Sequence, residues 1–395
     1  MSWDEERLAR AGLSASCEAG APRLAALVAA EGAQAVWQAL RRGPEESTWA
    51  RRARLVDLDR LVERSESLGV AFLVPGDEQW PEQLNALEGA QVGGMGGPPV
   101  GLWARGPGRL SAGCTSGLAV VGARSSTPYG ESVAADLAAG LARGAGRKPG
   151  AGHRWTIFSG GAYGIDACAH RAALSAGGTT VAVLAGGLDE PYPRGNHSLF
   201  ERLAAEQLLV SEVPVGLRPT RAGFLARNRL IAALTQGTVL VEAGARSGAI
   251  NTASWAAECG RHVMAVPGPV HSAMSEGCHR LVRDGRASLV SCVDDVQVLV
   301  QPLGQAPLAD IGGPSRELDG VEPGLLAVRE VLPGRGAMPV GEVAARAGLA
   351  IPATLASLGA LEQLGLAGCD EAGQWRILRP RPARTDVPAR RTGTA

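Results

Sequence analysis

The stretch at residues 118–141, LAVVGARSSTPYGESVAADLAAGL, predicts a buried strand, a tight turn and a helix in direct succession. Residues 118–121 form a short, valine-rich apolar run, which is typical of a strand buried on both faces. Gly122 ends this run, and residues 131–141 then repeat alanine and leucine at helical spacing. Such a strand, turn and helix is the first part of a unit that builds parallel sheets.

The same alternation continues through the centre of the chain. Short β-branched runs separated by alanine-rich stretches predict six more strands, at residues 156–158, 179–185, 208–212, 238–242, 262–266 and 289–293. Strands that alternate with helices form a parallel sheet with helices on both faces, so we predict the α/β class. Most of these strands end in glycine, and ligands of such sheets bind at the carboxyl ends of the strands.

The region before this sheet has a different pattern. Residues 1–69 repeat leucine and valine at spacings of three, four and seven, which predicts a small helical module ahead of a central domain at residues 70–300. Within that domain, residues 70–74 are expected to form a short strand. Residues 91–99, QVGGMGGPP, contain too much glycine to sustain regular structure.

The region after the sheet predicts a second domain boundary. Residues 301–322 are rich in proline and glycine and predict a linker, whereas residues 323–379 predict three short helices and a hairpin, typical of a winged helix. The expected recognition helix at residues 351–366 contains neither arginine nor lysine, so we expect this module to contact protein rather than DNA. Residues 380–395 have almost no apolar content and predict a disordered tail.

The composition narrows the possible functions. The 395 residues include 39 basic and 39 acidic side chains, so any site for a polyanion must be local. Lys148 is the only lysine, and arginine therefore supplies nearly all of the positive charge. The apolar runs are too short to cross a bilayer, and the first thirty residues do not resemble an export signal. Seven scattered cysteines without a C-x-x-C pair favour reduced thiols, so we expect a cytoplasmic protein with no membrane partner.

Two glycine-rich loops are candidate anion sites. The loop at residues 120–130 offers Gly122, a helix start with free N–H groups, and the charged fork of Arg124. In the loop SGGAYGIDACAH we select Ser159, Gly160, Gly161, Tyr163, Gly164 and Asp166. Asp166 and His170 lie four residues apart, and we interpret them as a hydrogen bond that braces the helix rather than as an acid and base. The alternative for both loops is that the glycines only permit a turn.

Arginine supplies the remaining candidates. Residues 216–229, GLRPTRAGFLARNR, hold Arg218, Arg221, Arg227 and Arg229 with no acidic residue to offset them. From this segment we select Arg227, Asn228 and Arg229, with Phe224 for base stacking. A solvated helix face is the alternative for such a run. At residues 244–253, GARSGAINTA, we select Arg246, Ser247 and Gly248 as a further anion site at a helix start.

Several motifs of enzymes are missing. The dinucleotide fingerprint G-x-G-x-x-G and the lysine of G-x-x-x-x-G-K-[ST] do not occur, which disfavours nicotinamide enzymes and P-loop ATPases. The G-x-S-x-G nucleophile pattern is also missing, and the histidines and cysteines have no metal-ligand spacing. We therefore expect no cofactor, no metal and no catalytic residue.

The order of these motifs resembles the DNA-processing protein A (DprA, Smf) family. The motifs are VGARSSTPYG, SGGAYGIDACAH, AGGLDEPYPRGN, FLARNRLIAALT, LVEAGARSG and SEGCHRLVRDG. The resemblance implies an extended Rossmann-like domain that binds single-stranded DNA without breaking it, usually as a homodimer, and loads the recombinase RecA during natural transformation. It also implies that Arg124, the glycines around Ser159 and the R-N-R motif at residues 227–229 contact DNA or support such contacts. Tyr163 departs from the family pattern, because members commonly carry a basic residue there.

Two other functions remain open at this point. Phosphoribohydrolases that release a base from nucleotides share a Rossmann-like core, but their P-G-G-x-G-T-x-x-E signature is not found. The nearest segment is QGTVLVE at residues 236–242, in which Glu242 is more simply a strand-end residue. A domain that senses a small nucleotide is the third reading.

Overall fold

The computed structural model describes residues 3–145, 153–300, 318 and 321–378, in two compact units, Met1–Leu308 and Ala309–Ala395. A nine-stranded sheet forms the centre of the first unit, in the order β1-β4-β8-β7-β6-β5-β9-β10-β11. Its strands are β1 (Val70–Leu73), β4 (Leu102–Arg105), β5 (Gly117–Val121), β6 (Thr156–Ser159), β7 (Thr180–Leu184), β8 (Leu208–Ser211), β9 (Gly237–Leu240), β10 (His262–Ala265) and β11 (Ser288–Leu289).

The α/β class is confirmed, and six of the seven predicted runs each hold most of a strand. The prediction for residues 289–293 is wrong beyond its first residue, because β11 ends at Leu289 and a helix begins at Val293. From β8 to β11 all neighbours are parallel, whereas β4 is antiparallel to both β1 and β8. The sequence did not predict β4, because four residues between Gly101 and Gly106 are too few to show a period.

The expectation that residues 91–99 have no regular structure is wrong. They contain a small hairpin made of β2 (Gln91–Val92) and β3 (Met95–Gly96). Gly93 and Gly94 form its two-residue turn with φ values of 60° and 79°, which glycine adopts readily. The glycines that argued against regular structure therefore permit the tightest kind of hairpin.

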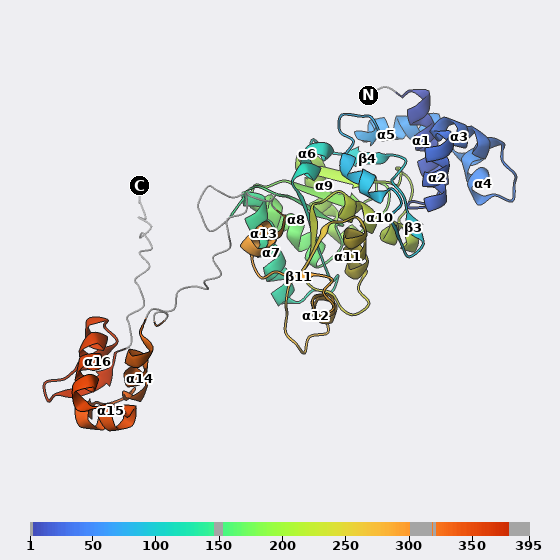
Figure 1. The fold of residues 1–395 in the computed structure, drawn as a ribbon. Coiled ribbons are helices and arrows are strands. Elements are labelled where there is room, and N and C mark those ends of the chain that lie inside the picture. The colour runs from blue at the N-terminus through green and yellow to red at the C-terminus, as the bar shows by residue number, and fades with distance from the viewer. Residues whose placement is uncertain (1–2, 146–152, 301–317, 319–320, 379–395) are drawn as a thin grey trace, which may run out of the picture. The chain divides into compact units, whose positions relative to one another are not determined.

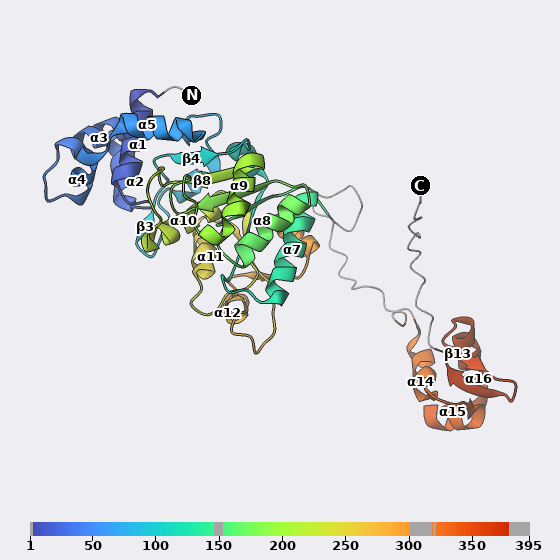
Figure 2. The ribbon, with the colours of Figure 1, turned by 180° about the vertical axis from the view of Figure 1, so that it is seen from behind.

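Helices cover both faces of the sheet (Figures 1 and 2). Leu118 and Val120 of β5 pack with α7 (Pro128–Arg143), α8 (Ile165–Ser175) and α13 (Val293–Val300). Ala119 and Val121 point to the opposite face, toward α10 (Arg221–Ala233) and α11 (Gly248–Glu258). This alternation is the two-residue period of a strand that is buried on both sides. The unit also holds α6 (Leu110–Thr115), α9 (His197–Glu206), α12 (Glu276–Arg283) and two 3-10 turns, Glu82–Leu87 and Arg194–Asn196.

The strand order reverses at β5. The chain proceeds from β5 through β6, β7 and β8 on one side, and then returns through α10 to place β9 on the other side of β5. The helices that follow β5 and β9 consequently lie on opposite faces, and the loops at the carboxyl ends of these two strands separate. A crevice at such a point is the usual ligand site of an open α/β sheet.

Five helices lie in the span predicted to be helical. They are α1 (Glu5–Ser16), α2 (Pro22–Glu31), α3 (Ala33–Arg42), α4 (Thr48–Leu55) and α5 (Leu58–Ser67). Arg7 of α1 donates to both carboxylate oxygens of Asp77, at 2.7 and 2.8 Å, and so joins this module to the turn after β1. The hydrogen bond from Arg7 lowers the pKa of Asp77. The proposed boundary at residue 69 remains a prediction, because the module and the sheet lie in one compact unit.

The second unit contains the expected three helices and hairpin. Its elements are α14 (Pro323–Val331), β12 (Met338–Pro339), α15 (Val340–Ala347), α16 (Ile351–Gln363), β13 (Ala367–Cys369) and β14 (Gln374–Ile377). The assignment as a winged helix stays a prediction. Most of the predicted linker at 301–322 and the whole tail at 380–395 lie outside the described residues, as does Lys148. Of the described helices, none alone has the length and apolarity to span a membrane, although α15 and α16 together meet that criterion with a bend of 102° between them.

Candidate nucleic-acid interface

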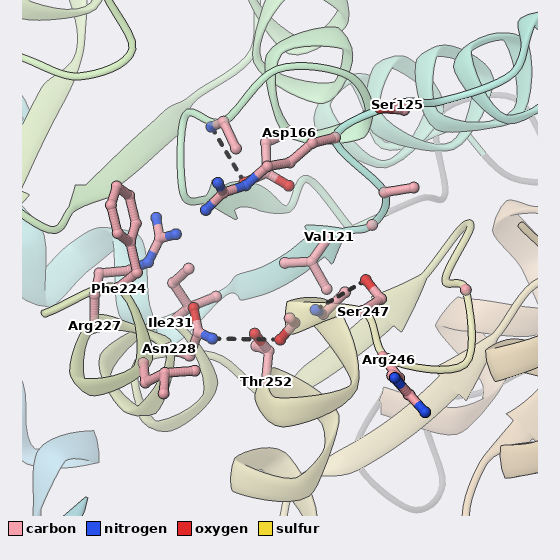
Figure 3. A pocket seen from close by; sticks show the side chains of 18 of the residues that line it. Val121, Ser125, Asp166, Phe224, Arg227, Asn228, Ile231, Arg246, Ser247 and Thr252 are labelled. Carbon is pink, nitrogen blue, oxygen red and sulfur yellow. Dashed lines mark hydrogen bonds between the residues drawn. The ribbon is translucent and has the colours of Figure 1, made fainter. Parts of the chain in front are cut away.

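A cavity of about 630 Å³ opens at the carboxyl ends of β5 and β9, where the strand order reverses (Figure 3). Its walls come from the loop after β5, from α10, and from the loop that leads from β9 into α11. Nine of the fifteen residues selected from the sequence line it: Gly122, Arg124, Asp166, Phe224, Arg227, Asn228, Arg246, Ser247 and Gly248. The fold thus gathers side chains from four separate segments of the chain around one cavity.

Exposed arginines surround this cavity. Arg124 comes from the loop after β5, Arg221 from the first turn of α10, and Arg246 from the loop after β9. Arg246 lies across the cavity from Arg227 and Phe224 (Figure 3). Arg221 belongs to the arginine-rich segment but was not selected from the sequence, where nothing distinguishes it from Arg218. Arg218 is exposed but does not line the cavity.

Arg227 forms part of the cavity wall from a buried position. Its Nη1 donates to the carbonyl oxygen of Val183 at 2.7 Å, and the side chain lies near Asp166. Burial lowers the pKa of Arg227 to about 10, which leaves the guanidinium charged at neutral pH. A Cβ on Gly160 would lie 1.8 Å from Nη1, so the glycine makes room for this guanidinium.

The N–H groups of the second glycine loop already have an acceptor. The carboxylate of Asp166 accepts from the N–H groups of Gly160 and Ala162, at 3.1 and 3.4 Å. Burial raises the pKa of Asp166, and the nearby charge of Arg227 opposes that shift. Our interpretation that this loop offers its N–H groups to a phosphate is therefore wrong for these two residues. The expected bond between Asp166 and His170 is wrong too, because His170 Nδ1 instead contacts Thr180 Oγ1 at 2.7 Å.

A carboxylate of the protein itself also binds the helix start after β5. Glu242, at the end of β9, accepts from the backbone N–H and the hydroxyl of Thr127, at 2.9 and 2.6 Å. The hydroxyl oxygen of Thr127 in turn accepts from the N–H of Gly130 at 3.2 Å. Glu242 is only 2% exposed. A buried carboxylate therefore takes the place at the start of α7 that we predicted for an external anion.

Arg229 is placed differently from the expectation. The segment 216–229 contains no acidic residue, but Arg229 Nη2 donates to both carboxylate oxygens of Glu212, at 2.6 and 2.7 Å. The Arg229 side chain is 1% exposed, and Gly20 of the helical module packs against it. Arg229 cannot reach DNA from this position. It joins α10 to the segment after β8, and this corrects its selection as a direct contact.

Asn228 and Ser247 hold the cavity wall in shape. Asn228 Nδ2 donates to the carbonyl of Gly248 at 3.4 Å, which links α10 to the start of α11 (Figure 3). It also donates to Asn251 Oδ1 at 3.2 Å. The hydroxyl of Ser247 accepts from the N–H of Ala249 at 3.3 Å and caps α11. These polar groups fix the two helices that carry the cavity, so their main contacts are within the protein.

Of the two aromatic candidates, Phe224 lines the cavity and Tyr163 does not. The Arg124 guanidinium carbon is 5.0 Å from the centroid of the Phe224 ring, within the range of a cation–π contact. Tyr163 does not line the cavity, but it is half exposed, and its hydroxyl accepts from the N–H of Gly195 at 3.2 Å. The other selected residues outside the lining, Ser159, Gly160, Gly161 and Gly164, build the loop behind it. Ser159, for example, is fully buried and donates to the carbonyl of Val120 at 2.7 Å.

Comparison with known proteins identifies the family. The model described as DNA recombination-mediator protein A matches residues 71–301. A protein of Mycobacterium tuberculosis named as a DNA processing protein DprA is 45% identical over 378 residues, which cover 93% of each chain. The structure of DNA processing protein A from Streptococcus pneumoniae superposes with a TM-score of 0.61 at 28% identity, over 76% of this chain and all of that one. That of the Helicobacter pylori protein, described for its single-stranded DNA binding mode, gives 0.48 at 27% identity, over 57% and 93%. The chain belongs to the DNA recombination-mediator protein A family.

Proposed function

We propose that the arginine-lined cavity binds single-stranded DNA. The observation that carries this proposal is the convergence of Arg124, Arg221, Arg227 and Arg246 on one cavity that also holds an aromatic ring. The carboxylate of Asp166, which also lines the cavity, accepts hydrogen bonds from backbone N–H groups and lies near the positive charge of Arg227. The net positive charge at the cavity therefore remains available to phosphates. Membership of a family of DNA processing proteins supports the same ligand class.

Phe224 favours a single strand over a duplex. Aromatic rings bind unpaired bases by stacking, whereas the faces of the bases in a duplex are already stacked on each other. Because the start of α7 and the loop before α8 hold their own carboxylates, the arginine side chains carry the phosphate contacts in this proposal. Arg227, fixed by Val183, sets the position of the strand, and the three exposed arginines close around it.

The proposal includes a role for the bound strand. We propose that the protein acts as a homodimer, protects DNA without breaking it, and delivers it to the recombinase RecA. Binding without cleavage agrees with the separate partners of Asp166 and His170, which do not form an acid and base pair. Incubation with labelled DNA should leave the strand intact on a denaturing gel, and nucleoside monophosphates should release no base. RecA filaments should assemble faster in the presence of the protein, and light scattering should give the mass of a dimer.

The binding site is tested by titration of a labelled oligo-dT. Arg227→Ala and Arg124→Ala should each weaken binding by roughly 10- to 100-fold, because a charge-assisted hydrogen bond contributes about 1.5–3 kcal/mol. Each lost phosphate contact should also reduce the slope of log affinity against log salt by about 0.7. Arg143→Ala is the matched control, since Arg143 is exposed in the last turn of the same helix that begins beside Arg124. Unchanged affinity in both cavity variants would contradict the proposal.

A further inference from the structure

Tyr192 stands beside the cavity on a loop that the proposed function does not use. All three tyrosines of the chain are exposed, Tyr129 at 42%, Tyr163 at 47% and Tyr192 at 50%. Tyr192 differs from the others because its ring approaches Phe224, with centroids 5.8 Å apart and planes at 65°. Phe224 lines the cavity and Tyr192 does not. The aromatic surface therefore continues beyond the cavity along the loop between β7 and α9.

This loop is fixed at both ends. At its start, the Asp189 carboxylate accepts from the N–H of Gly216 at 2.9 Å and pairs with Arg64 at 2.6 Å. At its end, Asn196 Nδ2 donates to the carbonyl of Gly161 at 3.1 Å. The loop is thus bonded to the helical module, to the segment that precedes α10, and to the glycine loop before α8. An exposed ring on such a loop is already ordered and loses little conformational freedom on binding.

We infer that Tyr192 is a base-stacking residue of a second nucleotide subsite, next to the one whose phosphate the cavity arginines hold. This inference rests on the proposed function. Its chemical requirement is an unpaired base, because the half-exposed Tyr192 ring can hold a nucleobase by stacking but offers no cation to a phosphate. The T-shaped contact with Phe224 holds the two rings next to each other with their planes at 65°, so that neighbouring bases of one strand can each meet a ring where the strand turns between them.

The test separates bases from phosphates. Wild-type protein is titrated with oligo-dT and with an abasic oligonucleotide of the same length, which keeps every phosphate. We expect wild type to prefer oligo-dT, and Tyr192→Ala to reduce that preference about fivefold or more while its affinity for the abasic strand stays the same. Tyr192→Phe should retain the preference, because the ring is kept. Tyr129→Ala is the control: Tyr129 is similarly exposed, but its hydroxyl donates to Pro267 and its ring does not contact Phe224.

The outcomes distinguish this inference from the proposed function. If wild type binds neither oligonucleotide, the proposed function itself fails. If wild type prefers oligo-dT and Tyr192→Ala keeps the full preference, the second subsite is refuted and the arginine cavity stands. Thermal melting of Tyr192→Ala confirms that the variant is folded, and Tyr192→Phe supplies an independent comparison if it is not.

Discussion

Replacement of Arg229 by alanine should destabilise the first unit without removing a DNA contact. In the native protein the Arg229 and Glu212 side chains are 1% and 10% exposed. Arg229 Nη2 donates hydrogen bonds to both carboxylate oxygens of Glu212. Arg229→Ala leaves the carboxylate of Glu212 buried without its cation. Removal of one partner of a buried ion pair costs about 3–5 kcal/mol, because the remaining charge stays desolvated.

Urea unfolding followed by tryptophan fluorescence measures this loss. Seven of the eight tryptophans lie in the first unit, so the signal reports on the unit that holds the ion pair. With a denaturant slope of about 3 kcal/mol/M, the midpoint should fall by about 1–2 M. The double variant Arg229→Met with Glu212→Leu removes both charges and keeps the volume, so its midpoint should return close to that of the wild type.

Binding decides between the two roles of Arg229. Under conditions where Arg229→Ala remains folded, its affinity for oligo-dT should stay within about threefold of wild type, well below the loss expected for a phosphate contact. A variant that unfolds at the wild-type urea concentration but binds oligo-dT ten times more weakly would refute this reasoning. It would mean that Arg229 leaves Glu212 to reach the DNA.

Two further predictions concern Gly160, in the loop behind the cavity, and His170, in the helix α8 that follows this loop. Gly160→Ala should weaken oligo-dT binding about as much as Arg227→Ala, because the new methyl group would occupy the space of the guanidinium, 1.8 Å from Nη1; normal affinity would show that Arg227 can move without cost. Burial lowers the pKa of His170 from 6.5 to about 3, so only the unfolded chain takes up a proton on this histidine as the pH falls between these values. The contribution of neutral His170 to the free energy of unfolding is therefore fully present above pH 6.5. As the pH falls toward 3, this contribution decreases by up to about 1.4 kcal/mol per pH unit. His170→Gln should flatten the fall of the urea midpoint with decreasing pH, and an unchanged slope would contradict the assignment.

Periodicity predicted the sheet because its signal is local. The predicted runs are apolar or β-branched, are flanked by glycine or polar residues, and alternate with helical stretches long enough to recognise. β4 gives no such signal, since its four residues are shorter than any period that could identify it. The hairpin at residues 91–96 was missed for the opposite reason, because two glycines in a tight turn look the same in a sequence as two glycines in a loop.

The site was predicted less completely than the fold. Arg227 and Arg229 are two residues apart on α10, so they point about 200° apart around the helix, one to the cavity and the other to Glu212. Nothing in the sequence of the segment reveals which is which, because Glu212 lies 17 residues earlier. The same limit applies to Thr127 and Glu242, whose contact joins residues 115 positions apart. Side-chain identity could be predicted from the sequence, but the partner of each charge depends on the tertiary structure.

The internal carboxylates of Asp166 and Glu242 affect how the site would discriminate between a mononucleotide and a DNA strand. Asp166 accepts from the backbone N–H groups of Gly160 and Ala162, and Glu242 accepts from the N–H and the hydroxyl of Thr127. Backbone N–H groups of this kind can bind a single small anion. Because these donors already have acceptors, a free mononucleotide would meet only separate arginines around an open cavity, and each of its contacts would be weak and screened by salt. A polymer engages several of these arginines at once, and its second contact benefits from the first. If the cavity binds DNA as proposed, the protein should therefore discriminate against small phosphates and in favour of a strand.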